Sequence, residues 1–219
     1  MVFQELTLMQ NIAVWALPVI FAITVHELAH GLAASKLGDQ SAKMLGRLTL
    51  NPIKHIDPIG SIVVPVVLLV LGGFVFGWAK AVPINANNFK SPRKDMAWVA
   101  VAGPASNLVM AIAWAFILKL GMLLQVSTPE VGQFLVYSGI AGVSINLVLL
   151  ILNLLPIPPL DGSHVVSAFL PKQLAWQFDR IGAYGFFILV GLMLTGILAP
   201  IMMGPYNLFK DAIFSLVGI

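Results

Sequence analysis

Five stretches of this sequence are each long and apolar enough to cross a lipid bilayer, and they limit the folds open to the chain. They cover residues 8–34, 59–79, 96–120, 133–156 and 181–203. The hydrocarbon core of a bilayer is about 30 Å thick, so a helix needs about 20 mostly apolar residues to span it. Charged residues make up only 10% of the chain and hydrophobic ones 59%, whereas soluble domains are roughly a quarter charged. The sequence therefore predicts an all-α polytopic membrane protein.

The stretch 59–79 differs from the others because glycines and a proline divide it into two short halves: Gly60, Pro65, Gly72 and Gly73. The flanking segments 36–58 and 80–95 are both rich in Lys and Arg. Basic loops collect on the cytoplasmic side, and a single crossing at 59–79 would separate these two segments. We therefore predict four full transmembrane helices and a re-entrant element or tight hairpin at 59–79.

This arrangement puts the N-terminus outside and 10 of the 12 Lys and Arg residues on the cytoplasmic side. We expect a multi-pass protein of the cell (plasma) membrane whose first apolar run is a retained helix, because no basic residue precedes it and no small-residue cleavage site follows. The formal net charge of +3 lies in loops. Such loop charges set orientation, so we expect no nucleic-acid partner.

No stretch of soluble composition is long enough for a second domain, so we expect a single intramembrane domain over 1–219. Its core is expected at about 8–175, followed by a C-terminal helix and tail over 181–219. The tail from residue 205 is too short to span and carries charges, which favours an interfacial segment. The chain has no cysteine, which excludes disulfide scaffolds and thiolate metal sites.

Residues 26–30 read His-Glu-Leu-Ala-His, near the end of the first apolar run. His26 and His30 are four residues apart, so on a helix they project from one face and can share a metal ion. Glu27 lies beside them and can accept a proton from metal-bound water. Ionisable side chains inside a membrane are costly unless they are paired or face water. This cost favours a functional interpretation over a chance occurrence of the motif.

A catalytic zinc ion normally takes three protein ligands and keeps one position open. Few other ligand-type side chains lie at or near a membrane segment: His55, Asp57, Asp161 and His164. Asp161 stands out because prolines before it break the helix and Gly162 after it allows close backbone approach. We interpret His55 as structural, and His164 as a solvated interfacial residue or a partner of Asp161.

Depth in the membrane supports the pairing with Asp161. His26 lies roughly 14–18 residues into its run, which is about 21–27 Å along a helix and so in the cytoplasmic third of the bilayer. Asp161 follows a helix that runs from outside to inside, and it therefore reaches the same depth. A single crossing at 59–79 would place Asp161 at the opposite face.

A further polar position lies at 103–107, which reads Gly-Pro-Ala-Ser-Asn at the cytoplasmic start of the 96–120 run. Small residues here allow close helix packing. Asn107 is able to donate a hydrogen bond to a substrate carbonyl. A packing glycine followed by an asparagine that bonds its own helix explains the pattern equally well.

Together these motifs resemble the site-2 protease family of intramembrane metalloproteases over roughly residues 15–175. They are His-Glu-x-x-His in the first helix, Gly-Pro-x-x-Asn at 103–107, and Asn-x-x-Pro followed by Leu-Asp-Gly over 153–162. Asn51-Pro52 and residues 55–60 also look like the compact prokaryotic members.

The resemblance implies that His26, His30 and Asp161 bind one zinc ion and that Glu27 is the general base. It also implies that Asn153 positions the substrate backbone or stabilises the tetrahedral intermediate, with Asn107 as a further candidate. The implied reaction is hydrolysis of a peptide bond within or next to a transmembrane segment of a membrane-protein substrate. The active site is expected near the cytoplasmic side of the bilayer.

The family's β-structured re-entrant loop corresponds to part of 36–95, and the chain has room for neither a PDZ nor a CBS domain. The β-branched run 61–64 suggests that a substrate adds to this segment as a strand. The sequence does not indicate an oligomeric state.

Two other classes remain as alternatives. A metal transporter or channel also places His and Asp inside helices, but it calls for polar positions through the whole membrane depth. A non-catalytic relative that holds membrane partners is expected to lack a ligand or the base. All four such residues are present here.

Overall fold

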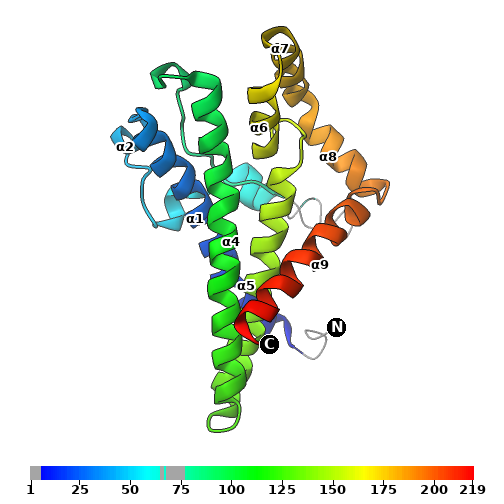
Figure 1. Ribbon diagram of the computed structural model, residues 1–219. Helices are drawn as coiled ribbons and strands as arrows, with labels where there is room; N and C mark the ends of the chain where they lie inside the picture. The colour runs from blue at the N-terminus through cyan, green and yellow to red at the C-terminus, as the bar shows by residue number, and fades with distance from the viewer. Residues whose placement is uncertain (1–5, 65–66, 68–76) are drawn as a thin grey trace.

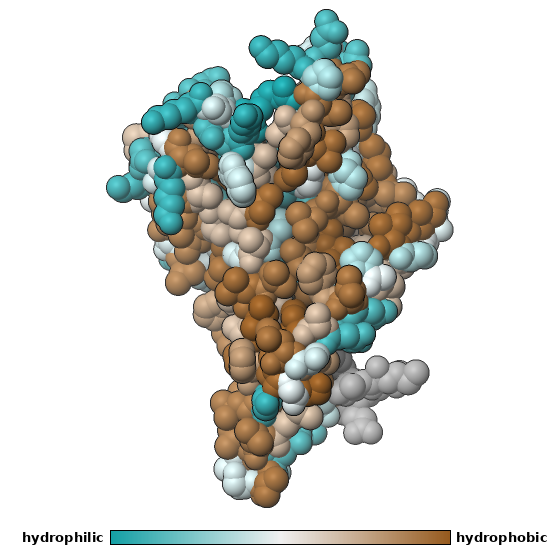
Figure 2. Space-filling model, viewed as in Figure 1, coloured by the Kyte–Doolittle hydropathy of each residue, from teal (hydrophilic) through white to brown (hydrophobic). Residues whose placement is uncertain are grey.

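The computed structural model describes residues 6–64, 67 and 77–219, and the regular structure in these ranges is helical. Four helical stretches are long and apolar enough to cross a membrane. They are α1 (Leu8–Leu37), α4 (Pro92–Leu124), α5 (Pro129–Leu154) and the stretch Lys172–Leu194. The prediction of an all-α multi-pass membrane protein is therefore confirmed. Figure 2 shows hydrophilic residues gathered at the end that carries α2, α7 and the start of α4, above a largely hydrophobic surface.

The remaining helices are shorter. The stretch Lys172–Leu194 consists of α7 (Lys172–Arg180), the 3-10 turn η4 (Ile181–Tyr184) and α8 (Gly185–Leu194). Before it comes α6 (Asp161–Phe169), and after it α9 (Leu198–Val217). Between α1 and α4 lie α2 (Ser41–Met44), the 3-10 helix η1 (Pro52–His55), the π-helix η2 (Ile59–Val63) and the 3-10 helix η3 (Ala86–Asn88).

Helices α1, α4 and α5 pack side by side and form the centre of the bundle (Figure 1). Their main core joins buried residues of α4 and α5 with two from α9: Ala111, Trp114, Ala115, Val143, Leu147, Leu150, Ile151, Ile213 and Val217. Alanines on α4 permit the close approach of helices that stabilises bundles in lipid. Helix α6 packs against the first half of α4, near the end of α5 (Figure 1).

The end of α1 is fixed by polar contacts to the segment that leads into α4. Gly38 ends the helix with a φ of 118°, a left-handed conformation that suits glycine. The next residue, Asp39, is fully buried and accepts hydrogen bonds from the N–H of Asn85 at 2.7 Å and the side-chain amide of Asn88 at 2.7 Å. It also accepts the hydroxyl of Ser41 at 2.6 Å. One carboxylate therefore joins two segments that are far apart in the sequence.

The predicted boundaries at the C-terminal end were wrong. The run 181–203 is not one helix, because α8 ends at Leu194 and the chain turns at Gly196, whose φ is 73°. The expected interfacial tail from residue 205 is part of α9, which packs against α4 and α5. Ile213 and Val217 share a helix face four residues apart and are buried there. The ammonium of Lys119 on α4 also donates to the carbonyl of Val217.

The re-entrant element predicted at 59–79 lies mostly outside the described residues. Its described start, η2, is helical, and the described residues of 36–95 contain no strand, so the β-structured segment is not confirmed. The carboxylate of Asp57 accepts the N–H groups of Ile59 at 2.9 Å and Gly60 at 2.8 Å. These bonds cap the start of η2, which is helical where the residue types favoured a strand.

Candidate metal centre

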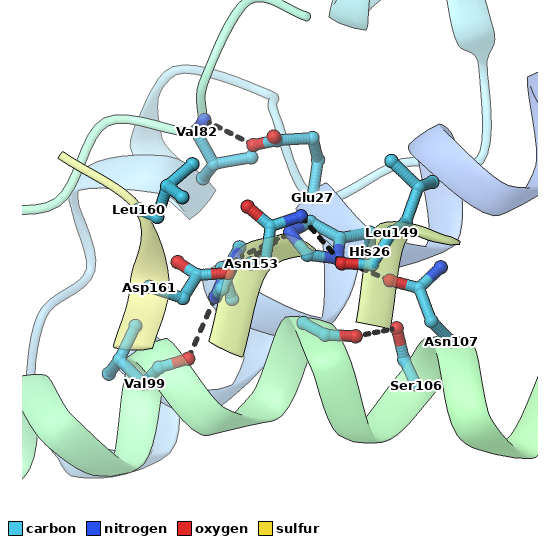
Figure 3. Close-up of polar contacts among 12 residues, drawn as sticks. His26, Glu27, Val82, Val99, Ser106, Asn107, Leu149, Asn153, Leu160 and Asp161 are labelled. Carbon is cyan, nitrogen blue, oxygen red and sulfur yellow. Dashed lines mark hydrogen bonds and ion pairs between the residues drawn. The ribbon is translucent and has the colours of Figure 1, made fainter. Parts of the chain in front are cut away.

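Three ligand atoms from α1 and α6 converge on one another, with His26 and Asp161 labelled in Figure 3. The Nε2 atoms of His26 and His30 lie 3.0 Å apart, because the two residues follow one another on one face of α1. Oδ2 of Asp161, the first residue of α6, lies 3.3 Å from each of them. Of the described residues, only these three form such a group, while His55, Asp57 and His164 lie outside it.

The outer nitrogen of each imidazole contacts an oxygen that only accepts hydrogen bonds. Nδ1 of His26 lies 2.6 Å from Oδ1 of Asn107, and Nδ1 of His30 lies 2.7 Å from the carbonyl of Val99. Each Nδ1 must therefore carry the proton, which leaves the Nε2 lone pairs facing one another and the carboxylate. Oδ2 of Asp161 is buried and accepts no hydrogen bond from the described residues. Two imidazoles and a carboxylate arranged in this way fit a zinc ion.

Asn107 is fully buried on α4, and its amide is completely engaged by protein groups. Besides the contact with His26, its Nδ2 donates to the carbonyl of Ala22 at 3.2 Å and to Oδ1 of Asn146 at 2.9 Å. Nδ2 of Asn146 in turn donates to the carbonyl of Gly142 at 2.9 Å. A chain of two amides thus links α5 to His26, and Asn107 has no donor left for a substrate. Asn146 was missed by sequence reasoning, although a polar side chain in an apolar run was the available signal.

Gly103 on α4 lies directly against the imidazoles of His26 and His30. A Cβ at this position would lie 2.4 Å from Nε2 of His30 and 2.6 Å from Cε1 of His26. Any side chain here would therefore occupy the space next to the ligand atoms. The sequence suggested only a packing role for this glycine, because a sequence does not show which atoms face a missing side chain.

Glu27 lies next to the cluster and is held by the main chain of a distant segment. Its Oε2 accepts the N–H of Val82 at 2.9 Å (Figure 3). Glu27 is half-buried, whereas Val82 is buried. One oxygen of the carboxylate is thus fixed by a backbone donor. Sequence reasoning missed this contact because any residue except proline offers such a donor.

Asn153 lies in the last turn of α5, whose end adjoins the start of α6 at Gly162. Its Nδ2 donates to the carbonyl of Leu149 at 2.9 Å, and its Oδ1 accepts no hydrogen bond from the described residues. The side chain is half-buried. It therefore keeps hydrogen-bonding capacity that Asn107 lacks.

The turn before α6 brings Asp161 close to the end of α5. A Cβ on Gly162 would lie 2.3 Å from the carbonyl oxygen of Leu154, so the close backbone approach expected at this glycine is present. The guanidinium of Arg93, at the start of α4, donates to the carbonyls of Ser167 and Leu170. Both ends of α6 are thereby attached to the bundle that carries the histidines.

Apolar helices long enough to span a membrane surround a His–His–Asp donor set with a glutamate beside it, an arrangement that suits a membrane metalloprotease. Residues 119–195 match the family model described as Peptidase family M50. The chain is 39% identical over 203 residues to "Putative zinc metalloprotease YwhC" of Bacillus subtilis (strain 168), covering 90% of this chain and 87% of that protein. The chain therefore belongs to peptidase family M50, the site-2 protease family, and is a zinc metalloprotease.

Two mycobacterial relatives carry the same description under the name Rip2. The Mycolicibacterium smegmatis protein is 34% identical over 177 residues, which cover 80% of this chain and 64% of that protein. The Mycobacterium tuberculosis (strain H37Rv) protein is 29% identical over 204 residues, which cover 91% and 72%. No solved structure matches the chain.

Proposed function

We propose that His26, His30 and Asp161 hold the single zinc ion and that Glu27 is the general base of this protease. The observation that carries this proposal is the convergence of three ligand atoms within 4.8 Å of one another. Zinc in such a site lowers the pKa of water and polarises a carbonyl group. The substrate class we propose is a membrane protein, cut at a peptide bond within or next to a transmembrane segment.

Glu27 is suited to move the proton in this reaction. The N–H of Val82 holds Oε2, which leaves Oε1 to accept a proton from the attacking water. The same carboxyl group then donates that proton to the departing amine. Because Oε2 is fixed by the backbone, Oε1 of Glu27 is oriented without a hydrogen bond from another side chain.

Asn107 and Asn153 have different roles in this proposal. Asn107 is a positioning residue, because its Oδ1 holds the protonated Nδ1 of His26 and so directs Nε2 toward the metal. Asn153 is the group that contacts the substrate backbone, since it is half-buried at the end of α5 that adjoins α6 and its Oδ1 accepts no hydrogen bond from the described residues.

The metal centre is proposed to lie near the cytoplasmic face of the plasma membrane. His26 is the nineteenth residue of α1, about 27 Å along the helix from Leu8. The basic loops on either side of η2 and the hydrophilic end seen in Figure 2 support this orientation.

The test is co-expression of the full chain with tagged single-span membrane proteins, with zinc measured on each purified variant. Glu27→Gln is expected to keep its zinc and to lose cleavage, because the general base is gone while the ligands remain. Asp161→Asn is expected to lose both zinc and cleavage. Equal cleavage by the parent chain and Glu27→Gln would refute the assignment of the base.

A further inference from the structure

A second site lies outside the metal centre, between the segment that follows α2 and the segment that precedes η3. It is a cavity of about 490 Å³. Three cationic side chains line it, Arg47, Lys54 and Lys80, together with the apolar side chains of Leu45, Ile53 and Ile56. No acidic residue belongs to its lining.

The described part of the chain supplies no counter-charge to the cations of this cavity. Among the described residues, Arg47, Lys54 and Lys80 take part in no ion pair. Arg47 is only 9% exposed, and its Nε has no hydrogen-bond partner in the described part of the chain. Its Nη2 donates to the carbonyls of Lys80 at 2.8 Å and Ala81 at 3.4 Å. A buried guanidinium without a carboxylate is costly, and an anion in the cavity removes that cost.

The rim of the cavity indicates where this anion comes from. Ile53 is 73% exposed, Leu45 65% and Ile56 43%. Large apolar side chains beside cations are unfavourable in water but typical of a surface that meets lipid head groups and acyl chains. A soluble acidic peptide would use the cations and leave these side chains without a partner. An amphiphile with a phosphate head uses both.

We propose that this cavity binds the phosphate of an anionic phospholipid, with an acyl chain along Leu45, Ile53 and Ile56. Basic pockets at membrane level bind such head groups. Arg47 fixes the carbonyls of Lys80 and Ala81, and the N–H of the next residue, Val82, holds Glu27. The lipid site therefore adjoins the segment that borders the metal centre.

The test is a lipid titration of the purified full chain by native mass spectrometry, with phosphatidylglycerol, phosphatidylcholine, inorganic phosphate and a soluble acidic peptide as probes. The parent chain is expected to bind one phosphatidylglycerol more tightly than any other probe. The double variant Lys54→Gln/Lys80→Gln is expected to bind it about 10- to 30-fold more weakly. The matched control Lys90→Gln/Lys94→Gln removes the same charge from exposed positions just before α4 and in its first turn, and it is expected to bind as the parent does.

Several results would overturn the proposal. Equal weakening in the two double variants would show that only net charge matters. Phosphatidylcholine bound as tightly as phosphatidylglycerol would remove the role of the anion. Tighter binding of inorganic phosphate or of the acidic peptide would assign the cavity to a soluble ligand. Zinc content measured on each variant verifies folding, and the single variants Lys54→Gln and Lys80→Gln repeat the test with smaller changes.

Discussion

Replacing Gly103 by alanine tests the metal centre by filling the space beside its ligands, without changing any charge. The added methyl carbon would lie 2.4 Å from Nε2 of His30 and 2.6 Å from Cε1 of His26. Non-bonded heavy atoms approach to roughly 3.5 Å, so one imidazole must move by about 1 Å. A misplacement of that size costs on the order of 100-fold in rate. We therefore expect Gly103→Ala to cut substrate at most about one hundredth as fast as the parent and to bind zinc at least about 10-fold more weakly.

The assay is cleavage of a tagged single-span protein in liposomes, with zinc affinity measured by competition with a chelator. Gly191→Ala on α8 is the matched control, since a Cβ there meets nothing within 4 Å. Both changes exchange glycine for alanine in a helix, so they gain the same helix propensity. Thermal unfolding of both variants shows whether the fold persists. Parent-like rate and zinc affinity in Gly103→Ala would refute the placement of this glycine under the ligand atoms.

Three further predictions concern two contacts around the metal centre and one at the end of α1. Asn107→Ala is expected to lower zinc affinity about 10- to 100-fold, measured by chelator competition, and an unchanged affinity would contradict the role of its amide. Val82→Pro removes the N–H that holds Glu27 and is expected to slow cleavage about 10-fold with zinc content unchanged, whereas Val82→Ala should cut normally. Burial opposes ionisation of Asp39, but the hydrogen bonds it accepts outweigh this and lower its pKa to about 2. Its stabilising effect is thus complete above its ordinary pKa of 3.8 and lost as pH falls through about 2. Asp39→Ala should therefore lower the melting temperature equally at every pH from 8 down to 5, and a gap that closes in this range would disprove the assignment.

The sequence was sufficient for the parts of this molecule that follow from periodicity and membrane depth. Apolar length and loop charges together predicted four spanning helices, and the described residues contain four helical stretches long and apolar enough to cross a membrane. His26 and His30 share a face because they are one helical turn apart. Asp161 was singled out because prolines break the helix before it and a glycine follows it, and the loop charges then placed it at the depth of His26. These inferences rely on the bilayer. In lipid every backbone polar group must be satisfied within the protein, so far fewer folds are open to a chain than in water.

Other features depend on contacts that leave no mark on a single sequence. Asn107 was expected to face either a substrate or its own helix, but its side chain contacts the imidazole of His26 on α1. An amide can bond to many kinds of partner, and only the packing of the helices decides which one it meets. The break at Gly196 was hidden within a continuously apolar run. The run 61–64 favoured a strand by residue type, and the carboxylate of Asp57 starts a helix there instead.

The amide chain from Asn146 through Asn107 to His26 has a consequence for how the protein matures. The amides and carbonyls that orient the two imidazoles belong to α1, α4 and α5 and come together when these helices pack. Helix assembly in the bilayer can thus be completed first, and the metal can load afterwards into a receptor that already exists. Chelation followed by zinc return should then restore activity without reinsertion, in contrast to zinc fingers, which unfold when their ion is removed.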